Sequence, residues 1–467
     1  MKLSILTALI AGMLMVNVPK HASAQETKPT SVFLSLQQAQ EYAITNNMQI
    51  RNSILDIDIA KKKIKEITSI GLPQINAQAN YTHLFKVPEL SIGGITYLGT
   101  TLPAGTPVTS DDILNQSVFL GYKPMDPIQL GVPDNLTLDI TVSQLIFSGE
   151  YIVGLQASRV FYQISEQGKQ LTELNVKESV SNTYNLVLVL KQTHDILNKS
   201  YNNLMTTLAE MRAMNEQGFI ENTDVDQIEL TSLNLENGLN SLQRQMEASN
   251  LLLKFQIGMS YDQELILTDS LEATTAGISL ESLTNEKLNL SKNITYQILT
   301  TQESLAELSL KREKSTYLPS LAAVYRHQEK VNAPAFDFNP KDVFAISMNI
   351  PIFSSGTRST KVSQRKFELE KAVNTKNNVA NGLELEFINS QNELKSAYEK
   401  YLNDKKNIDL TQRVYDKTLV KFKEGMSSSL DLTNAQNQYL TAQSNYFNAV
   451  YTLITAKNKL DKLTNNQ

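Results

Sequence analysis

The sequence lacks several residue types that would place the protein in common functional classes. Its 467 residues include no cysteine, no tryptophan and only four histidines. Without cysteine, the chain can form neither disulfides nor thiolate metal sites. Beyond the N-terminus no run of about eighteen apolar residues occurs, so we expect no transmembrane helix. The net charge is −5 and no basic patch interleaved with aromatic residues is present, so nucleic acid is not an expected partner.

Recognisable catalytic patterns are also missing. The sequence contains no P-loop, nucleophile elbow, zinc-binding helix or paired-carboxylate cleft pattern. His83, His194 and His327 are isolated, without a second histidine at metal-ligand spacing. We therefore expect a protein that is not an enzyme and that uses neither a metal nor a cofactor.

The first 24 residues have the pattern of a secretory signal peptide. Lys2 supplies the positive charge, residues 3–16 are apolar, and Ala22-Ser23-Ala24 matches an A-x-A cleavage site. We expect cleavage before Gln25 and export of the mature chain.

An internal repeat is the strongest organising signal. Gly425 repeats Gly218 after 207 residues, and Asp431 repeats Asp224 at the same offset. In both copies a glycine suited to a left-handed helix end precedes a new helix with an acidic first turn. The pattern predicts two helical hairpins with tips near residues 218–224 and 425–431.

Long helices are predicted on both sides of these tips. Residues 149–217 and 357–424 contain no proline, and at about 1.5 Å per residue each run would be on the order of 100 Å long. Coiled-coil packing would stabilise helices of this length. The clearest seam runs from Leu432 to Leu460, where apolar residues step by three and four and alternate between small and large. Shorter helices are predicted over residues 35–70 and 281–316.

Four segments instead alternate with a period of two, which predicts strands over residues 74–83, 135–147, 320–328 and 342–353. In the second segment one face is aliphatic, and the other carries Thr137, Asp139 and Thr141. A soluble sandwich or a transmembrane barrel could have such strands. Residues 85–134 contain six prolines and six glycines and are predicted to be a long, net acidic loop.

The elements occur twice in the order helix, strand, strand, long helix, turn, helix. We divide the chain into a signal peptide (1–24), a first repeat (25–257), a linker (258–282) and a second repeat (283–467). Four strands cannot close a barrel, because the smallest bacterial membrane barrels have about eight. An open sheet would leave its edges unpaired, and oligomerisation would solve both problems.

This layout resembles the TolC family of outer-membrane efflux and secretion channels. The resemblance rests on the duplicated halves, the two Gly-x-x-x-x-x-Asp turns and the sequence YLPSL at residues 317–321. The strand endings QLIFSGE and IPIFSSG and the pattern A-x-N-x-Y-L-x-A-x-x-x-Y from Ala435 to Tyr446 also contribute.

The resemblance implies a mixed α/β membrane protein that assembles as a homotrimer. Three chains would form a 12-stranded β-barrel in the outer membrane of a Gram-negative bacterium, and their coiled-coil helices would form a periplasmic α-barrel. The implied partners are a periplasmic adaptor, an inner-membrane transporter and outer-membrane lipid. The implied function is a passive exit duct for efflux or type I secretion. The alternative is a structural or adhesive coiled-coil envelope protein, which would not need four symmetrically placed amphipathic strands.

The same resemblance suggests site residues. Rings of carboxylates can select cations, although stabilisation of the helix starts is an equal alternative for these aspartates. Some family members have two aspartates one turn apart, whereas here Asn434 follows Asp431. The gate candidates are Asp224, Asp226, Asp431 and Asn434. The candidates for adaptor docking are Gly218, Gly425, Ser427 and Ser428. Asp139 and Arg326 are expected to face the barrel lumen.

Overall fold

The computed structural model describes residues 31–91, 93–104, 106–115, 118–276, 287–333 and 337–464. The predicted signal peptide and residues 277–282 of the predicted linker lie outside these ranges. The chain divides into two compact units. The first contains residues 1–48, 176–284 and 393–459, and the second contains residues 49–175, 285–392 and 460–467. None of the helices in the described part of the chain combines the length and apolar composition needed to cross a membrane.

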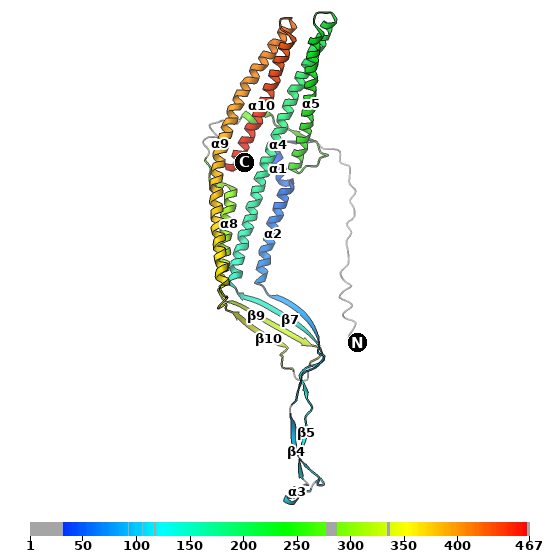
Figure 1. Ribbon diagram of the computed structural model, residues 1–467, viewed down its shortest axis with the longest axis vertical. Coiled ribbons are helices and arrows are strands. Elements are labelled where there is room, and N and C mark those ends of the chain that lie inside the picture. Colours follow the sequence, from blue (N-terminus) through cyan, green and yellow to red (C-terminus); the bar gives the residue numbers. More distant parts are fainter. Residues whose placement is uncertain are drawn as a thin grey trace. The chain divides into compact units, whose positions relative to one another are not determined.

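The second unit contains the four predicted strands as one antiparallel sheet (Figure 1). The strands are β2 (Gln74–His83), β7 (Asp134–Phe147), β9 (Ser320–Lys330) and β10 (Asp342–Asn349), in the order β10-β9-β7-β2. The fourth strand is shorter than predicted. It ends before Pro351, because proline has no N–H to donate to a neighbouring strand.

The two faces of this sheet differ in the way that the alternation predicts. Ile75, Val142, Tyr325 and Phe344 occupy one row across all four strands. Large apolar side chains on this face are exposed: Ile75 is 71% and Phe344 is 68% accessible. On β7 the polar side chains of the opposite face are the less exposed ones. The sheet therefore presents its apolar face outward, which is the reverse of a soluble sheet packed on a core.

Residues 85–134 are not the unstructured loop that we predicted. They contain β3 (Glu89–Leu90), β4 (Gly94–Thr100), α3 (Ser110–Leu114), β5 (Val118–Pro124) and β6 (Ile128–Gln129). β4 pairs with β5, and β3 pairs with β6, in both cases antiparallel. The prediction fails because the backbone hydrogen bonds of a hairpin come from a partner more than twenty residues away, such as Tyr122 for Thr96. The local periodicity of the sequence carries no information about a strand partner that is so distant in the chain.

The shorter helices of the two halves differ in their bounds from the prediction. The predicted helix over residues 35–70 is two helices, α1 (Leu36–Asn46) and α2 (Met48–Ile70), because Asn47 is extended. α8 (Ile294–Ser315) begins later than predicted. Residues 287–293, the described part of the predicted helix before it, contain a short 3₁₀ turn, η1 (Leu290–Lys292). Asn293 defines the start of α8 by accepting hydrogen bonds from the backbone N–H groups of Thr295 and Tyr296 at 3.0 and 3.2 Å.

The first unit contains the ends of two helical hairpins (Figure 1). One is formed by α4 (Gly149–Glu216) and α5 (Asn222–Ile257), and the other by α9 (Thr357–Lys423) and α10 (Ser429–Thr464). The predicted seam of α10 is confirmed, since Leu432, Ala442 and Leu453 are at most 2% exposed. Alternating small and large side chains allow helices to approach closely.

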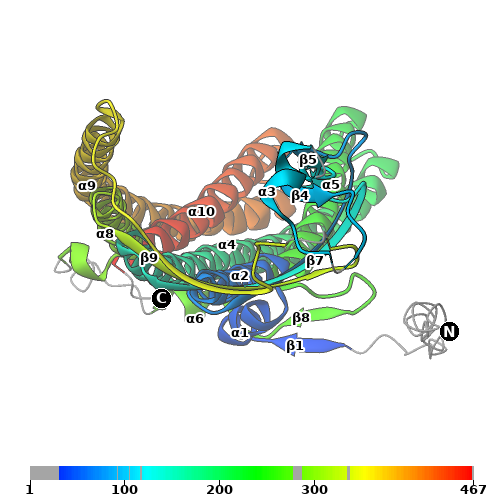
Figure 2. The ribbon, with the colours of Figure 1, turned by 90° about the horizontal axis from the view of Figure 1, so that it is seen from below.

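A small parallel sheet in the first unit was not predicted. β1 (Val32–Leu34) pairs with β8 (Leu265–Leu267), and both lie beside α1 (Figure 2). The hydroxyl oxygen of Tyr184 on α4 lies 3.0 Å from the carbonyl oxygen of Leu34 and 3.0 Å from a carboxylate oxygen of Asp269. Burial of this phenol raises its pKa, so it stays protonated as a donor. A further short helix, α6 (Leu271–Ala276), follows β8.

A pair of glycine substitutions in α5 tests this packing. Gly258 ends α5 with φ of 75°, and an added Cβ would lie 2.5 Å from the carbonyl oxygen of Asn46. We expect Gly258→Ala to destabilise the protein by more than the roughly 1–2 kcal/mol of left-handed strain alone. Gly238→Ala, where the Cβ meets open space inside the same helix, should stabilise it by about 0.5–1 kcal/mol. Thermal unfolding of the two purified variants should shift in opposite directions, and equal shifts would contradict this packing.

Candidate functional site

The two hairpins turn through the same backbone motif. Gly218 has φ of 77°, its N–H donates to the carbonyl of Asn215 at 2.8 Å, and the next N–H, of Phe219, donates to Met214 at 3.0 Å. At the other turn Gly425 has φ of 71°, and the corresponding distances are 3.0 and 2.8 Å. Both are Schellman motifs, in which a left-handed residue allows the last carbonyls of a helix to be bonded. A glycine is favoured at each position because of this conformation.

Beyond the second turn, Asp431 stabilises the start of its own helix. A single oxygen of its carboxylate accepts hydrogen bonds from the N–H and the hydroxyl of Ser428 at 3.1 and 2.7 Å, and from the Ser427 hydroxyl at 3.2 Å. The Asp431 N–H in turn donates to the Ser428 hydroxyl oxygen at 3.1 Å. This reciprocal arrangement is a capping box. The bonds from Ser428 lower the pKa of Asp431, so its carboxylate is ionised at neutral and mildly acidic pH.

Asp224 occupies the equivalent place after the first turn but makes a different bond. Its carboxylate accepts a hydrogen bond from the hydroxyl of Ser429, which belongs to α10. The N-cap of its own helix is Glu221, whose side chain does not cap the helix. The two aspartates that the repeat makes equivalent therefore differ: Asp431 holds its own helix, whereas Asp224 links the hairpins. Asp226 and Asn434 are both exposed.

A shared core beneath the turns joins the two hairpins. Leu432 of α10 packs in one buried cluster with Val225 and Ile228 of α5. The rings of Tyr415 and Tyr439 stack there at a centroid distance of 5.7 Å. The other buried members of the cluster are Leu204, Leu208 and Met211 of α4. An ion pair of 2.9 Å between Lys423 and Glu210 also connects the hairpins. The turns are thus held on a packed base.

The sequence analysis missed two apolar side chains at the turns. Phe219 and Met426 directly follow the glycines and are 72% and 73% exposed. In Schellman motifs an apolar residue at this position frequently packs back on the helix. An apolar residue immediately after each turn glycine is the sequence signal that could have identified them. Together with the exposed Gly218, Gly425 and Ser428 and the half-buried Ser427, they form the surface at the turns.

The two residues expected to face a lumen lie on the same face of the sheet. Asp139 is paired across the strands with Gln328, and Thr141 is paired with Arg326. The carboxylate of Asp139 accepts a hydrogen bond from the Gln328 side chain at 2.7 Å. This is the polar face of β7, opposite to the exposed aliphatic face.

The histidines of the strands are isolated in sequence but not in space. His83 lies 2.7 Å from the carboxylate of Asp134, which also accepts a hydrogen bond from the Tyr81 hydroxyl at 2.7 Å. The second strand pair repeats this group with Tyr325, His327 and Asp342, at 2.6 Å for the tyrosine and 2.8 Å for the histidine. The repeated Tyr-x-His spacing was the available signal. Among the described residues no group of three or more acidic or histidine side chains is arranged to hold a metal ion.

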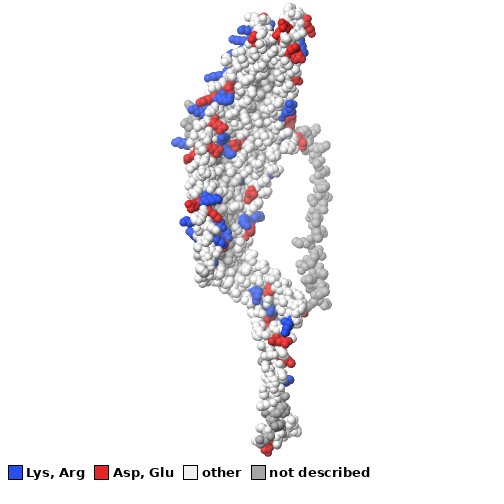
Figure 3. All heavy atoms as spheres, in the orientation of Figure 1, with Lys and Arg blue, Asp and Glu red and all other residues white. Residues whose placement is uncertain are grey.

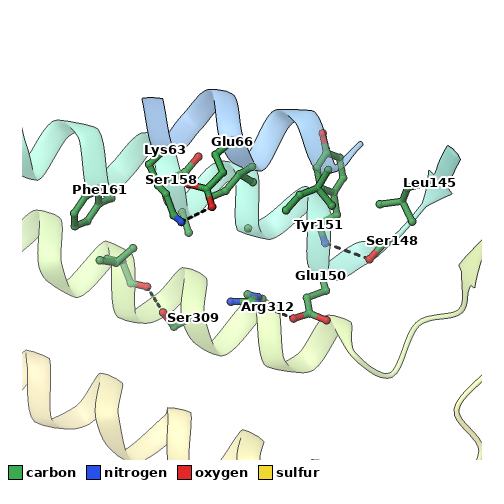
Figure 4. A pocket seen from close by; sticks show the side chains of 15 residues that line it. Lys63, Glu66, Leu145, Ser148, Glu150, Tyr151, Ser158, Phe161, Ser309 and Arg312 are labelled. Atoms are coloured by element: carbon green, nitrogen blue, oxygen red, sulfur yellow. Dashed lines mark hydrogen bonds and ion pairs between the residues drawn. The ribbon is translucent and has the colours of Figure 1, made fainter. Parts of the chain in front are cut away.

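The second unit also contains a cavity of about 650 Å³ between α2, α4 and α8 (Figure 4). Its lining is mainly apolar, with Ile70, Leu145 and Phe161 among the residues that contribute. An ion pair between Arg312 and Glu150 lies at its edge. None of the predicted site residues lines this cavity.

Removal of the capping hydroxyl tests the role of Asp431. We expect Ser428→Ala to destabilise the start of α10 by about 1 kcal/mol, and Ser428→Gly by only a few tenths. The ionised Asp431 carboxylate stabilises the start of α10 at neutral pH. This stabilisation is lost as the pH falls through the lowered pKa of Asp431. Hydrogen exchange of the first α10 amides should accelerate in Ser428→Ala at neutral pH. Unchanged exchange would show that the capping box does not hold this turn.

Part of the chain matches one protein family in sequence, and nearly the whole chain matches solved structures in fold. Residues 284–466 match the family model described as outer membrane efflux protein. No curated protein matches the chain in sequence. The fold is similar to crystal structures of CusC, at 12% identity and a TM-score of 0.70, over 94% of this chain and 95% of that one. It is also similar to the CmeC outer membrane channel of Campylobacter jejuni, at 14% identity and a TM-score of 0.68, over 96% and 93% of the two chains. The open-state MtrE outer membrane channel of Neisseria gonorrhoeae is similar at 14% identity and a TM-score of 0.68, over 95% of this chain and 93% of that one.

The family match lies within the second half of the chain, at residues 284–466, and the similarity of fold extends over nearly its whole length. The C-terminal part of the chain is therefore similar in sequence to outer membrane efflux proteins, and the whole chain has the fold of the solved outer membrane channels.

Proposed function

We propose that this chain is one of three identical subunits of an exit duct that spans the outer membrane and extends into the periplasm. Each subunit contributes four strands to a 12-stranded β-barrel, and the helical hairpins form an α-helical tunnel. The duct passively conducts substrates that an inner-membrane pump delivers through a periplasmic adaptor. It performs no catalysis and uses no cofactor.

The observation that carries this proposal is the sheet with an exposed apolar face. Side chains such as Ile346 and Met348, each 60% exposed, would be unfavourable in water but are suited to contact with lipid. The polar face, with Asp139 and Arg326, would line the lumen. Among the similar proteins, transmembrane channel formation is described for CusC, and CmeC is an outer membrane channel.

The edges of the sheet support a trimer. β2 and β10 are its outer strands, and each leaves one row of backbone groups without a partner strand among the described residues. In a ring of three chains, β2 of one subunit would pair with β10 of the next, and no edge would remain. The alternative, an adhesive coiled-coil protein, gives no reason for this sheet.

The internal repeat is part of the proposal. Each half contains a helix, two strands of the sheet and a helical hairpin with the same glycine turn, on the two sides of the segment 258–282. The repeated Tyr-His-Asp groups support a common origin of the halves. Three copies of each turn would surround the axis at the periplasmic end of the tunnel. There the exposed Phe219 and Met426 would be available to an adaptor.

Electrophoresis of membrane-extracted protein tests the trimer. Unheated samples should migrate near three times the mass of the 52.2 kDa chain, less the cleaved signal, and heated samples as the monomer. Closed barrels resist detergent until they are heated, because every strand edge is paired. A detergent-free soluble monomer would contradict the duct.

The bond between Ser429 and Asp224 is the proposed closing link of the tunnel. A hydrogen bond to a charged group contributes about 1.5 kcal/mol at the low end of its range, which is about tenfold in a two-state equilibrium. We expect Ser429→Ala to raise single-channel conductance or open time in planar bilayers. Ser444→Ala, the same change at an exposed position of α10, should behave as wild type. If both variants match wild type, the gate lies elsewhere.

A further inference from the structure

α10 contains a long stretch without any ionisable side chain apart from tyrosine. None of the residues from 432 to 456 is Asp, Glu, Lys, Arg or His, although 19% of the whole chain is charged. Asp431 precedes this stretch and Lys457 follows it. A helix that is buried on all sides could lack charged residues because charged side chains are costly to bury. α10 is not such a helix, because one of its faces is exposed.

The exposed face of α10 is made of uncharged polar side chains. We call it the amide stripe, and define it as Asn434, Gln438, Thr441, Asn445, Asn448 and Thr452, all of which are exposed. These positions step by four and three, so they lie along one side of the helix. Asp431 lies at the turn end of the same side and is exposed as well.

The amide stripe continues into a groove of about 460 Å³ between α10 and α9. Asn407 and Thr411 of α9 also line the groove, and their side chains again carry an amide and a hydroxyl. No charged side chain lines the groove. The uncharged surface therefore extends across part of two helices.

The rest of α9 provides a contrast within the same hairpin. Its exposed side chains next to Gln412 include Lys405, Asp409 and Asp416. In Figure 3 the coloured charged atoms follow α9, and the adjoining surface over α10 is white. An outer surface in water ordinarily carries such charges, which favour solubility. A subunit interface would be poor in charge too, but it would be enriched in aromatic and other apolar residues rather than Asn, Gln and Thr.

We propose that the amide stripe lines the water-filled interior of the duct as an uncharged section of its wall. This inference rests on the proposed function. Amide and hydroxyl groups can hydrogen-bond to cargo of either charge or of none. The wall along α10 therefore selects by size and hydrogen bonding and not by charge.

A matched pair of substitutions tests this inference on the full-length trimer in planar bilayers. Gln438→Glu adds one negative charge per subunit to the amide stripe, and Gln412→Glu adds the same charge to the charged side of α9. Since rings of acidic side chains select cations, Gln438→Glu should raise the potassium-to-chloride permeability ratio about twofold or more. Gln438→Lys should lower it below the wild-type value, and Gln412→Glu should leave it unchanged.

The outcomes separate this inference from the proposed function. If wild-type protein forms no channel, the proposed function fails. If it conducts but Gln438→Glu leaves the permeability ratio unchanged, or Gln412→Glu changes it equally, the amide stripe does not line the interior. Both substitutions are at exposed positions, and unaltered trimer migration on a gel would show that they fold.

Discussion

The unpaired backbone groups along β2 and β10 are the constraint on which the proposed architecture depends. Four strands with an exposed apolar face are stable neither as a soluble sheet nor as an open sheet in lipid, where each unbonded N–H or carbonyl costs several kcal/mol. In the proposed trimer, each edge is paired with its neighbour and the apolar face meets lipid. The strands of the three subunits would then be related by three-fold symmetry, and so would the helical hairpins connected to them.

The helices meet a different requirement, which is to remain long without a large core. α4 and α9 are 68 and 67 residues long. In the first unit the hairpins they form with α5 and α10 pack through narrow seams of small and large side chains. The buried cluster around Leu432 and Ile228 shows where such seams join two hairpins. One cluster near the turns holds the glycine motifs and both aspartates in place.

Much of this fold could be predicted from the sequence, because its signals are local. The strand alternation, the proline-free helices and the turn glycines report on neighbours a few residues away, and they place these elements to within a few residues. The β4–β5 hairpin and the β1–β8 pair could not be found in this way, since their partners are distant in sequence. For the same reason the sequence repeat predicts Asp224 and Asp431 as equivalent residues at the two turns. They differ because Asp224 accepts a hydrogen bond from Ser429, which belongs to the other hairpin.

The different bonding of the two aspartates has a consequence for how the turns could move. Asp431 keeps its capping bonds whatever the neighbouring hairpin does, because all its partners lie within residues 427–431. Asp224 can release Ser429 without unwinding any residue of α5, since the capping of that helix does not depend on it. Separation of the hairpins would therefore need only side-chain rotation and the loss of contacts, and no backbone turn would have to refold. Motion of that kind is reversible and can be repeated with every passage of cargo.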